Sequence, residues 1–141
     1  KKNYFNTHKE KVLQINNTTN NNQIINAPQL DMNYFHTITE EDKDLKVRMI
    51  RIMLDETPDE ILKLKKFSTE ENWENLRAIA HKMKSSMQFL GMSDTLEVVK
   101  SIELSAKEKT NLQQIPEKIN RVVQDCTLAL QELEKELEKI E

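Results

Sequence analysis

Residues 73–92, with the sequence WENLRAIAHKMKSSMQFLGM, decide how this chain folds. Apolar side chains recur in this stretch at alternating intervals of three and four residues: Trp73, Leu76, Ala80, Met83, Met87 and Leu90. An α-helix turns once every ~3.6 residues, so this spacing places all of them on one helical face. Gly91, the only glycine of the chain, follows where a helix commonly ends in a left-handed residue. The stretch predicts a helix near 70–90 with one buried and one polar face.

The C-terminal part of the chain carries the longest apolar seam. Its members recur at intervals of four and three residues: Ile119, Val123, Cys126, Leu130, Leu133, Leu137 and Ile140. This alternation is typical of a helix that packs in an antiparallel bundle or a coiled coil. We therefore expect a helix near 114–140, with Pro116 close to its start and Cys126 as a buried, unreactive thiol.

Helix start signals divide the rest of the chain. Thr39 is a good N-cap, Ser68 opens a capping box, and Ser93 follows Gly91 as the next cap. The run TPDE at 57–60 places a proline at the first helical position after a capping threonine, so it predicts that one helix ends there and another begins. These signals predict further helices near 31–37, 40–56, 58–67 and 94–108.

Each of these further helices has apolar residues to bury. For the segments near 40–56 and 58–67 the predicted core residues are Leu45, Met49, Ile52, Met53 and Leu62. For the helix near 94–108 they are Leu96, Val99, Ile102 and Ala106. Short connections join neighbouring helices, so we predict an all-α fold: an antiparallel up-down-up-down four-helix bundle with a short N-terminal helix, formed by residues 30–141.

The composition excludes several classes of protein. A single glycine cannot supply a P-loop, a Rossmann fingerprint or a kinase glycine-rich loop, and a single cysteine cannot form an internal disulfide or a cysteine-based zinc cluster. The net charge is −3, with +3 on residues 1–29 and −6 on the remainder, so nucleic acid is not an expected partner. No stretch approaches the ~18 apolar residues of a membrane span, so no direct membrane contact is expected.

Residues 1–29 differ from the rest of the chain because asparagine crowds into them. Asparagine disfavours helix interiors, so we interpret this segment as a linker or tether, with a disordered terminus as the alternative. The segment lacks the apolar core of a signal peptide. We expect a cytoplasmic location, which includes the cytoplasmic part of a membrane-anchored sensor. Because the chain begins with Lys1 rather than Met, we expect a fragment or a processed product.

His81 lies one position beyond the apolar face of the helix near 70–90. Its neighbours on its own helical face are all polar, namely Arg77, Lys84, Ser85 and Gln88. His81 is therefore predicted to be exposed to solvent in the middle of a rigid helix. An ordinary surface histidine without a chemical role is the alternative interpretation of the same pattern.

The residues around His81 favour phosphoryl chemistry. A neutral imidazole nitrogen is a good nucleophile near pH 7. Lys84 and Arg77 could place cations against the oxygens of a phosphoryl group on the ring, and Gln88 could orient the ring or bind the phosphate. A metal site is not expected, because the positions three and four residues on hold a lysine and Ser85. A Ser/His/Asp triad is not expected either, because this face holds no acidic residue to orient the ring.

Residues 80–92, AHKMKSSMQFLGM, resemble the signature of histidine-containing phosphotransfer (Hpt) domains, which carry phosphoryl groups in two-component phosphorelays. The matching elements are the Ala–His pair, Lys84, the two small residues at 85–86 and the Leu–Gly pair at 90–91. The run WENLR at 73–77 also resembles the family, and the likeness extends over roughly 30–141. The family often has glycine at the position of Ser85.

The resemblance implies that His81 takes a phosphoryl group from the aspartate of one receiver domain and passes it to another, while Lys84 holds the phosphate. It also implies a set of side chains that contact the receiver: Lys82, Ser85, Phe89 and Met92. Magnesium would be bound by the receiver, so this chain would need no cofactor, and without an ATP site it would not be an enzyme by itself. The resemblance further implies a module of a hybrid sensor kinase that is monomeric when isolated.

Three alternatives stay open. The apolar seam near 114–140 also fits a non-catalytic helical interaction or dimerisation domain. An inactive Hpt-like fold that only docks receivers would share the same pattern. The dimerisation and phosphoacceptor domain of a histidine kinase also uses a helical histidine, but it places an acidic residue directly after it, where this chain has Lys82.

Overall fold

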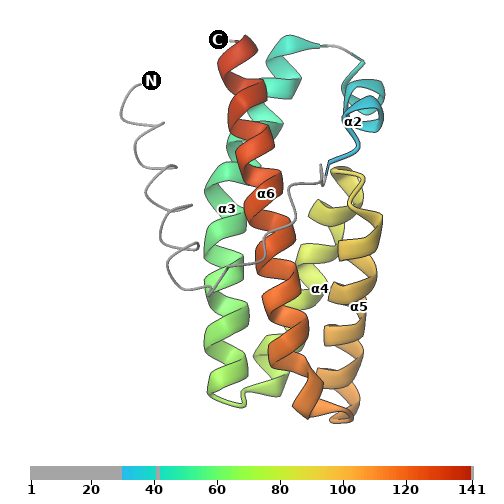
Figure 1. Cartoon of the computed structure of the whole chain (residues 1–141), viewed down its shortest axis with the longest axis vertical. Coiled ribbons are helices and arrows are strands. Elements are labelled where there is room, and N and C mark those ends of the chain that lie inside the picture. Colours follow the sequence, from blue (N-terminus) through green and yellow to red (C-terminus); the bar gives the residue numbers. More distant parts are fainter. Residues whose placement is uncertain (1–29, 41, 141) are drawn as a thin grey trace.

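The computed structural model describes residues 30–40 and 42–140, and these residues form a bundle of long helices (Figure 1). The interpretation of residues 1–29 as a tether lies outside the described residues. The elements, in chain order, are α2 (Met32–Thr39), α3 (Lys43–Thr69), α4 (Trp73–Phe89), α5 (Ser93–Glu108), the short 3₁₀ helix η1 (Leu112–Gln114) and α6 (Ile115–Ile140). The predicted all-α fold with a short N-terminal helix is confirmed.

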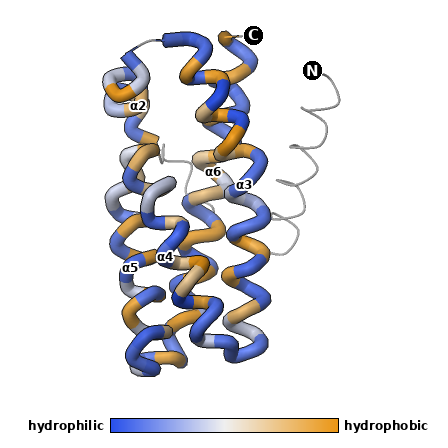
Figure 2. Tube along the Cα trace, turned by 180° about the vertical axis from the view of Figure 1, so that it is seen from behind, coloured by the Kyte–Doolittle hydropathy of each residue, from blue (hydrophilic) through white to orange (hydrophobic). Residues whose placement is uncertain are grey.

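The four long helices pack in chain order, and α6 returns to lie beside α3 (Figure 1). α2 covers the end of the α4–α5 pair rather than joining the bundle. It is held there by the backbone N–H of Asp31, which donates to the carbonyl oxygen of Leu90 at 3.3 Å, and by an edge-to-face contact of Phe35 with Phe89. Apolar positions recur at intervals along each helix, as the alternation of colour in Figure 2 shows. This is the pattern that an amphipathic helix needs to build a shared core.

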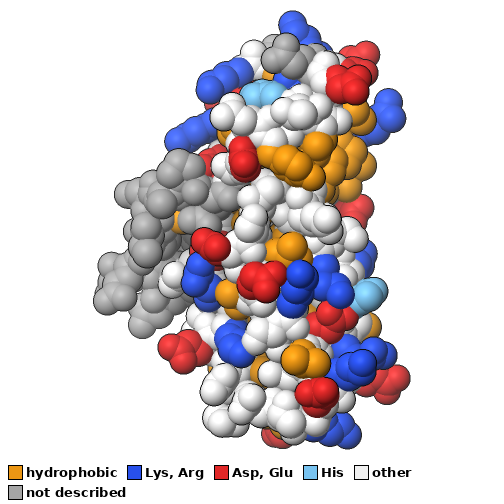
Figure 3. All heavy atoms as spheres, turned by 90° about the vertical axis from the view of Figure 1, so that its right-hand side faces the viewer, with side chains coloured by type: hydrophobic (Ala, Val, Ile, Leu, Met, Phe, Trp, Pro, Cys, Tyr) orange, Lys and Arg blue, Asp and Glu red, His pale blue; other side chains and the backbone are white. Residues whose placement is uncertain are grey.

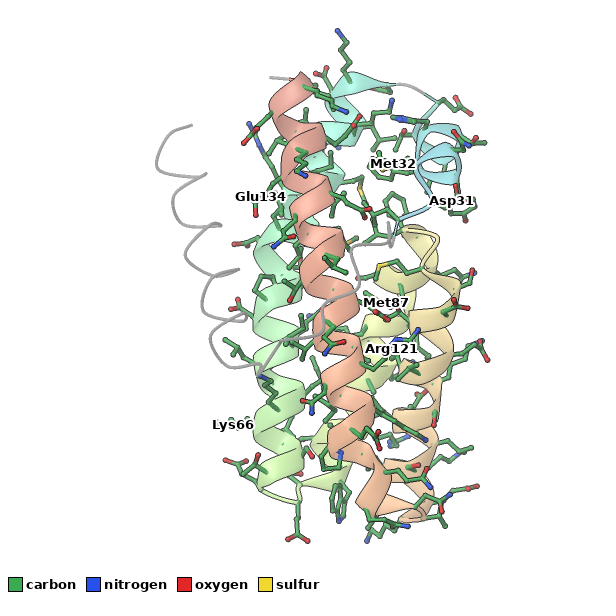
Figure 4. The ribbon with its side chains drawn as sticks, in the orientation of Figure 1. Asp31, Met32, Lys66, Met87, Arg121 and Glu134 are labelled. Atoms are coloured by element: carbon green, nitrogen blue, oxygen red, sulfur yellow. The ribbon has the colours of Figure 1, made fainter. Side chains whose placement is uncertain are left out.

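The predicted stripe of α4 and the predicted seam of α6 form the centre of the core. Leu76, Ala80, Met83 and Met87 of α4 have no exposed surface, whereas Trp73 is only half-buried. Met87 reaches Cys126 of α6 across the bundle interior, with 3.9 Å between the two sulfur atoms (Figure 4 labels Met87). The face of α6 that is buried is wider than a seam, because this helix packs against both α3 and α5.

The core face predicted for α3 is wrong in part. The fully buried residues of this helix are Ile50, Leu54, Ile61 and Leu64. Of the residues predicted instead, only Met53 is buried, Ile52 is exposed, and Leu45, Met49 and Leu62 are half-buried. The N-terminal half of α3 is apolar on several sides, so its periodicity alone does not select one face.

The predicted break at Pro58 is also wrong, because α3 runs through it without interruption. Proline inside a helix removes one backbone hydrogen bond and costs about 3 kcal/mol. The four buried aliphatic residues of α3 lie two on each side of Pro58, and burying each contributes roughly 1.5–3 kcal/mol. Only a continuous helix keeps them on one face, so the burial outweighs the local cost of the proline.

Three predicted caps are wrong as well. Thr39 ends α2, Ser68 lies within the last turn of α3, and Ser93 is the first residue of α5 with no cap of its own. The caps are instead Asp42 for α3 and Asn72 for α4, and each accepts a hydrogen bond from the backbone N–H three residues on. Asp42 and Asn72 belong to residue types preferred at an N-cap, as do Thr39 and Ser68. Each observed cap lies within four residues of the predicted one, so residue type alone did not distinguish the two positions.

Gly91 ends α4 as predicted. Its φ is +69°, and its N–H and that of Met92 donate back to the carbonyls of Gln88 and Met87, at 3.1 and 2.9 Å. This pair of bonds satisfies carbonyls that the helix end would otherwise leave free. A Cβ atom at this position would lie 2.8 Å from the Cβ of Asp31, closer than two carbon atoms pack. The position therefore excludes side chains for two reasons, backbone strain and the approach of the segment before α2.

We expect Gly91→Ala to lower the free energy of unfolding by roughly 1–3 kcal/mol, because alanine is strained at positive φ and its methyl group would displace Asp31. Urea unfolding followed by circular dichroism measures the change. Ser93→Ala, at an exposed position two residues on without a capping bond, is the control and should change it little. Equal midpoints for the Gly91 variant and the parent would contradict this account of the turn.

Glu60 is a buried carboxyl group on α3. Its side chain is only 5% exposed, Oε1 has no hydrogen-bond partner among the described residues, and Oε2 lies 3.6 Å from Nζ of Lys82 on α4. Burial raises the pKa of this carboxyl group, and the attraction of Lys82 offsets the effect only in part. The folded chain therefore binds this proton more tightly than the unfolded chain. The favourable contribution is complete below the unfolded pKa and is lost as the pH rises through the folded pKa.

We accordingly expect Glu60→Gln to raise the free energy of unfolding at pH 7–8, because the amide removes a buried charge with little change of shape. The gain should vanish below about pH 4, where the glutamic acid is neutral in both states. Unfolding curves measured across this pH range test the prediction. Glu138→Gln, at an exposed position near the end of α6, serves as the control. A loss of stability at pH 8 would show that the pairing with Lys82 outweighs the cost of burial.

Candidate functional site

His81 lies in the middle of α4, with a side chain that is 70% exposed, as predicted. Its Nδ1 is 2.6 Å from Oε2 of Glu103, which belongs to α5. An ionised carboxylate can only accept a hydrogen bond, so Nδ1 carries the proton and donates it. A neutral ring then has its lone pair on Nε2. The contact with Glu103 therefore selects which ring nitrogen is available as a nucleophile.

Lys84 completes the arrangement from one turn further along α4. Its Nζ lies 2.8 Å from the second oxygen, Oε1, of Glu103, so one carboxylate holds both the histidine and the lysine. The Glu103 side chain is 18% exposed and the Lys84 side chain 29% exposed, whereas His81 is 70% exposed. The carboxylate is therefore more deeply buried than the histidine ring that it contacts. The three side chains form a small network in which each oxygen of the carboxylate has its own donor.

Two opposing effects act on the ionisation of Glu103. Partial burial raises its pKa, but the hydrogen bonds and positive charges of Lys84 and His81 more than compensate, and the pKa lies below the usual value. Glu103 is therefore ionised across the physiological pH range. The carboxylate is available to accept a hydrogen bond from Nδ1 at any pH at which the chain would function.

The expectation that no acidic residue lies near His81 is wrong. That expectation rested on the residues of one face of α4, whereas the acidic residue, Glu103, belongs to α5. Gly91 turns the chain between the two helices, with His81 ten residues before it and Glu103 twelve residues after it. Residues at nearly equal distances from the turn of an antiparallel pair lie level with one another. That symmetry about Gly91 is the signal that could have identified Glu103 in the sequence.

His81 opens onto a surface depression between α4 and α5. The depression is lined by Arg77, His81, Lys84, Lys100, Glu103, Leu104 and Lys107. Arg77, which the sequence placed on the same helical face as His81, is among them. The lining contains no serine, threonine or cysteine. Within residues 30–40 and 42–140, no three His, Cys, Asp or Glu side chains group in a way that could hold a metal ion.

The other residues predicted for the site are not all brought to His81. Gln88 lies two turns along α4 and lines a separate depression that it shares with Asp31, Tyr34 and Gly91. Ser85 is exposed, in keeping with a surface that a partner can approach. Gln88 thus has a place on the same side of the helix but does not line the depression of His81.

Three more predicted contact residues have structural roles. Lys82 faces α3, where it pairs with Glu60. Phe89 is half-buried against Phe35, with 5.8 Å between ring centres. Met92 is only 2% exposed, whereas the contact with a receiver that the resemblance implied would need it at the surface. Its position between the end of α4 and the start of α5 places it under the turn, where the two helices converge.

Cys126 plays no part in the site. It is buried on α6, and burial, with smaller contributions from Asp125 and Glu60, raises the pKa of its thiol far above the usual range. The thiolate is the reactive form of cysteine, so this residue is inert, as predicted.

Comparison with known proteins adds one finding. The family model described as "Hpt domain" matches residues 48–141, two thirds of the chain, and this range includes α4, α5 and the whole of the His81 site. Neither the curated proteins nor the solved structures include a match to the chain. In the described part of the chain no helix combines the length and the apolar character needed to cross a membrane.

We expect Glu103→Gln to move the ring proton of His81 from Nδ1 to Nε2. Lys84 can only donate, so the glutamine must turn its carbonyl oxygen toward the lysine and present its NH₂ group to His81. Nδ1 then becomes the acceptor. Long-range ¹H–¹⁵N spectra of the imidazole, recorded at a pH where the ring is neutral, distinguish the two tautomers. Glu97→Gln, on the same helix and paired with Lys100, is the control. An unchanged Nδ1–H form in the Glu103 variant would show that the contact does not select the tautomer.

Proposed function

Since the chain belongs to the Hpt domain family, whose members carry phosphoryl groups in phosphorelays and exchange them with receiver domains, we propose that His81 is the residue that carries the phosphoryl group. One observation carries the assignment: His81 is 70% exposed, while its Nδ1 is held by Glu103. This combination leaves Nε2 free to meet a partner and keeps the ring from rotating. His36, the other histidine of the described residues, lies in α2, and its Nδ1 has no hydrogen-bond partner among those residues.

The transfer step follows from this geometry. Nε2 attacks the phosphorus atom of an aspartyl phosphate on a receiver domain, a P–N bond forms, and the P–O bond to the aspartate breaks. The aspartate leaves as a carboxylate and no proton is exchanged. The ring keeps its proton on Nδ1 and gains positive charge, which the Glu103 carboxylate 2.6 Å away stabilises. The reverse step passes the group to the aspartate of a second receiver.

Lys84 neutralises charge on the phosphoryl group. In the resting chain its Nζ is paired with Glu103, and it lies one helical turn from His81 on the same side of α4. A phosphoryl group on Nε2 brings about two negative charges, to which the ammonium can turn without leaving the carboxylate entirely. Arg77, one turn before His81 and lining the same depression, is placed to contribute a second cation. Gln88 is assigned the weaker role of a phosphate contact in the docked complex.

Hpt domains are phosphoryl carriers and are not generally classed as enzymes. In our proposal the receiver supplies the reactive aspartate and the Mg²⁺ that activates it, and this chain supplies a nucleophile held in one tautomer. We place the chain in the cytoplasm as a module of a hybrid sensor kinase, monomeric when isolated. Of the receiver contacts that the resemblance implied, we retain Ser85, which is exposed one turn from His81, since Lys82 and Phe89 are engaged with Glu60 and Phe35.

The apolar seam of α6, which also fits a dimerisation domain, is covered by other helices of the same chain. Leu130, Leu133 and Leu137 are at most 1% exposed, and α3 and α5 flank α6 on both sides. The pattern therefore has a sufficient explanation in the core of the bundle. This observation favours the carrier over the dimerisation domain as the function of the described residues.

We expect His81→Gln to abolish phosphorylation at position 81, because glutamine has no ring nitrogen to form the P–N bond. The chain is incubated with phosphoramidate, a small donor that needs no docking surface, and acid-labile, alkali-stable phosphate is located by mass spectrometry. His36→Gln is the matched control and should be labelled like the parent chain. Labelling of the His81 variant at the parental yield would end the assignment.

We expect Lys84→Ala to slow phosphotransfer from a phosphorylated receiver by about 10- to 100-fold, since it removes one charge-assisted donor from the transferring group. Rapid-quench kinetics at saturating receiver measures the rate. Lys66→Ala, toward the C-terminal end of α3 in Figure 4, removes an exposed lysine far from the site and should leave the rate unchanged. Equal slowing in both variants would mean that Lys84 acts only through the overall charge of the domain.

A further inference from the structure

Leu104 is the most exposed large apolar side chain of the described residues. It is 53% exposed, compared with 39% for Tyr34 and 37% for Ile52. Of these three, only Leu104 lines the same depression as His81. Tyr34 lines the separate depression near Gly91, and Ile52 lines one between the N-terminal part of α3 and the end of α6. An exposed apolar residue beside a reactive group is more informative than one elsewhere, because scattered surface leucines are common.

Leu104 lies between two lysines on one stripe of α5. Lys100, Leu104 and Lys107 are four and three residues apart, a spacing that puts all three on one helical face. Lys100 pairs with Glu97 at 3.2 Å, but both side chains are more than half exposed, so this contact holds the lysine weakly. Arg77 faces the stripe from α4 across the depression. We refer to Lys100, Leu104, Lys107 and Arg77 together as the α5 surface.

The charge of the depression is positive once its internal contacts are taken into account. Glu103 is the only acidic residue in the lining, and its two oxygens are already used by His81 and Lys84. The cations of the α5 surface are therefore not neutralised by the lining itself. The chain as a whole is acidic, and Figure 3 shows acidic and basic side chains intermingled on the side of the molecule that it displays. Around Leu104, by contrast, the three cations of the α5 surface form a local basic rim.

We propose that the α5 surface is where the receiver domain docks, with Leu104 as the apolar anchor and the three cations as an electrostatic rim. The inference rests on the proposed function, because the partner is a receiver. A receiver must hold Mg²⁺ with carboxylates next to its reactive aspartate, so the region around its phosphorylation site is acidic. An acidic rim on the receiver complements the basic rim here, and an apolar side chain of the receiver covers Leu104.

The other flank of His81 is less suited to this role. On the side toward α3, Lys82 is paired with the buried Glu60. The depression near Gly91 contains Gln88 and Tyr34 but not His81. The α5 surface is the part of the described residues in which an exposed apolar side chain, several cations and the nucleophile share one hollow. The receiver is therefore expected to approach along α5.

The test compares two donors of the phosphoryl group. Phosphoramidate labels His81 without docking, whereas receivers from the same genome, phosphorylated beforehand, must dock. The receiver that transfers fastest to the parent chain is used for Leu104→Asp and Lys107→Glu. The controls are Ile52→Asp, which makes the same change at another exposed apolar position, and Lys139→Glu, which reverses a charge near the end of α6. Each transfer rate is divided by the phosphoramidate rate of the same variant, so partial unfolding does not pass for lost docking.

We expect the half-saturating concentration of receiver to rise by about 10-fold or more for Leu104→Asp, with a saturated rate close to that of the parent. Lys107→Glu should raise this concentration as well and weaken its dependence on salt, since it reverses one positive charge of the rim. The inference is overturned if the two controls change the concentration as much as these variants, or if no receiver transfers to a chain that phosphoramidate labels. Failure of phosphoramidate to label His81 would instead overturn the proposed function, so the two failures are distinguishable.

Discussion

The carboxylate of Glu103 is the contact on which the rest of the site depends. One oxygen holds Nδ1 of His81 at 2.6 Å and the other holds Nζ of Lys84 at 2.8 Å. Without it, the histidine would be an exposed ring free to rotate and to exchange tautomers, and the lysine would be a flexible surface cation. A single partly buried carboxylate orients both groups, and the charges of those groups in turn keep it ionised by lowering its pKa despite burial.

This contact in turn requires the register between α4 and α5. His81 and Glu103 meet because Gly91 turns the chain at a point nearly midway between them. The turn is specified closely, since φ at Gly91 is +69° and a Cβ atom would collide with Asp31. The only glycine of the chain thus sets the position of Glu103 relative to His81, although it lies ten or more residues from both. Displacing the turn by one residue would rotate α5 by about 100° relative to α4 and remove the carboxylate from beneath the histidine.

The α3 helix shows where periodicity alone fails. Local signals around Pro58 resemble a helix start, and the apolar residues before it cover several faces, so neither the boundary nor the buried face could be assigned correctly. The structure settles both through Ile50, Leu54, Ile61 and Leu64, which stay on one buried face only if α3 is continuous. A proline costs a few kcal/mol locally, and burial spread over several turns exceeds that cost. By contrast, α4 and α6 have polar residues between their apolar positions, and most of the residues predicted for their cores are buried, although Ile79, Val122 and Ala129 were missed.

The sequence by itself determined the helical fold, the helix that carries His81, the exposure of that histidine and the presence of Lys84 one turn away. All of these follow from the ~3.6-residue period of the α-helix, which relates neighbours along one chain segment. Only the tertiary structure decided that Nδ1 of His81 contacts Glu103, that Met92 is buried, that Gln88 lies outside the depression of His81, and that Leu104 and its neighbouring lysines line that depression. These features involve residues of different helices. Whether such residues meet depends on the register and packing of the helices, which the periodicity within one helix does not specify.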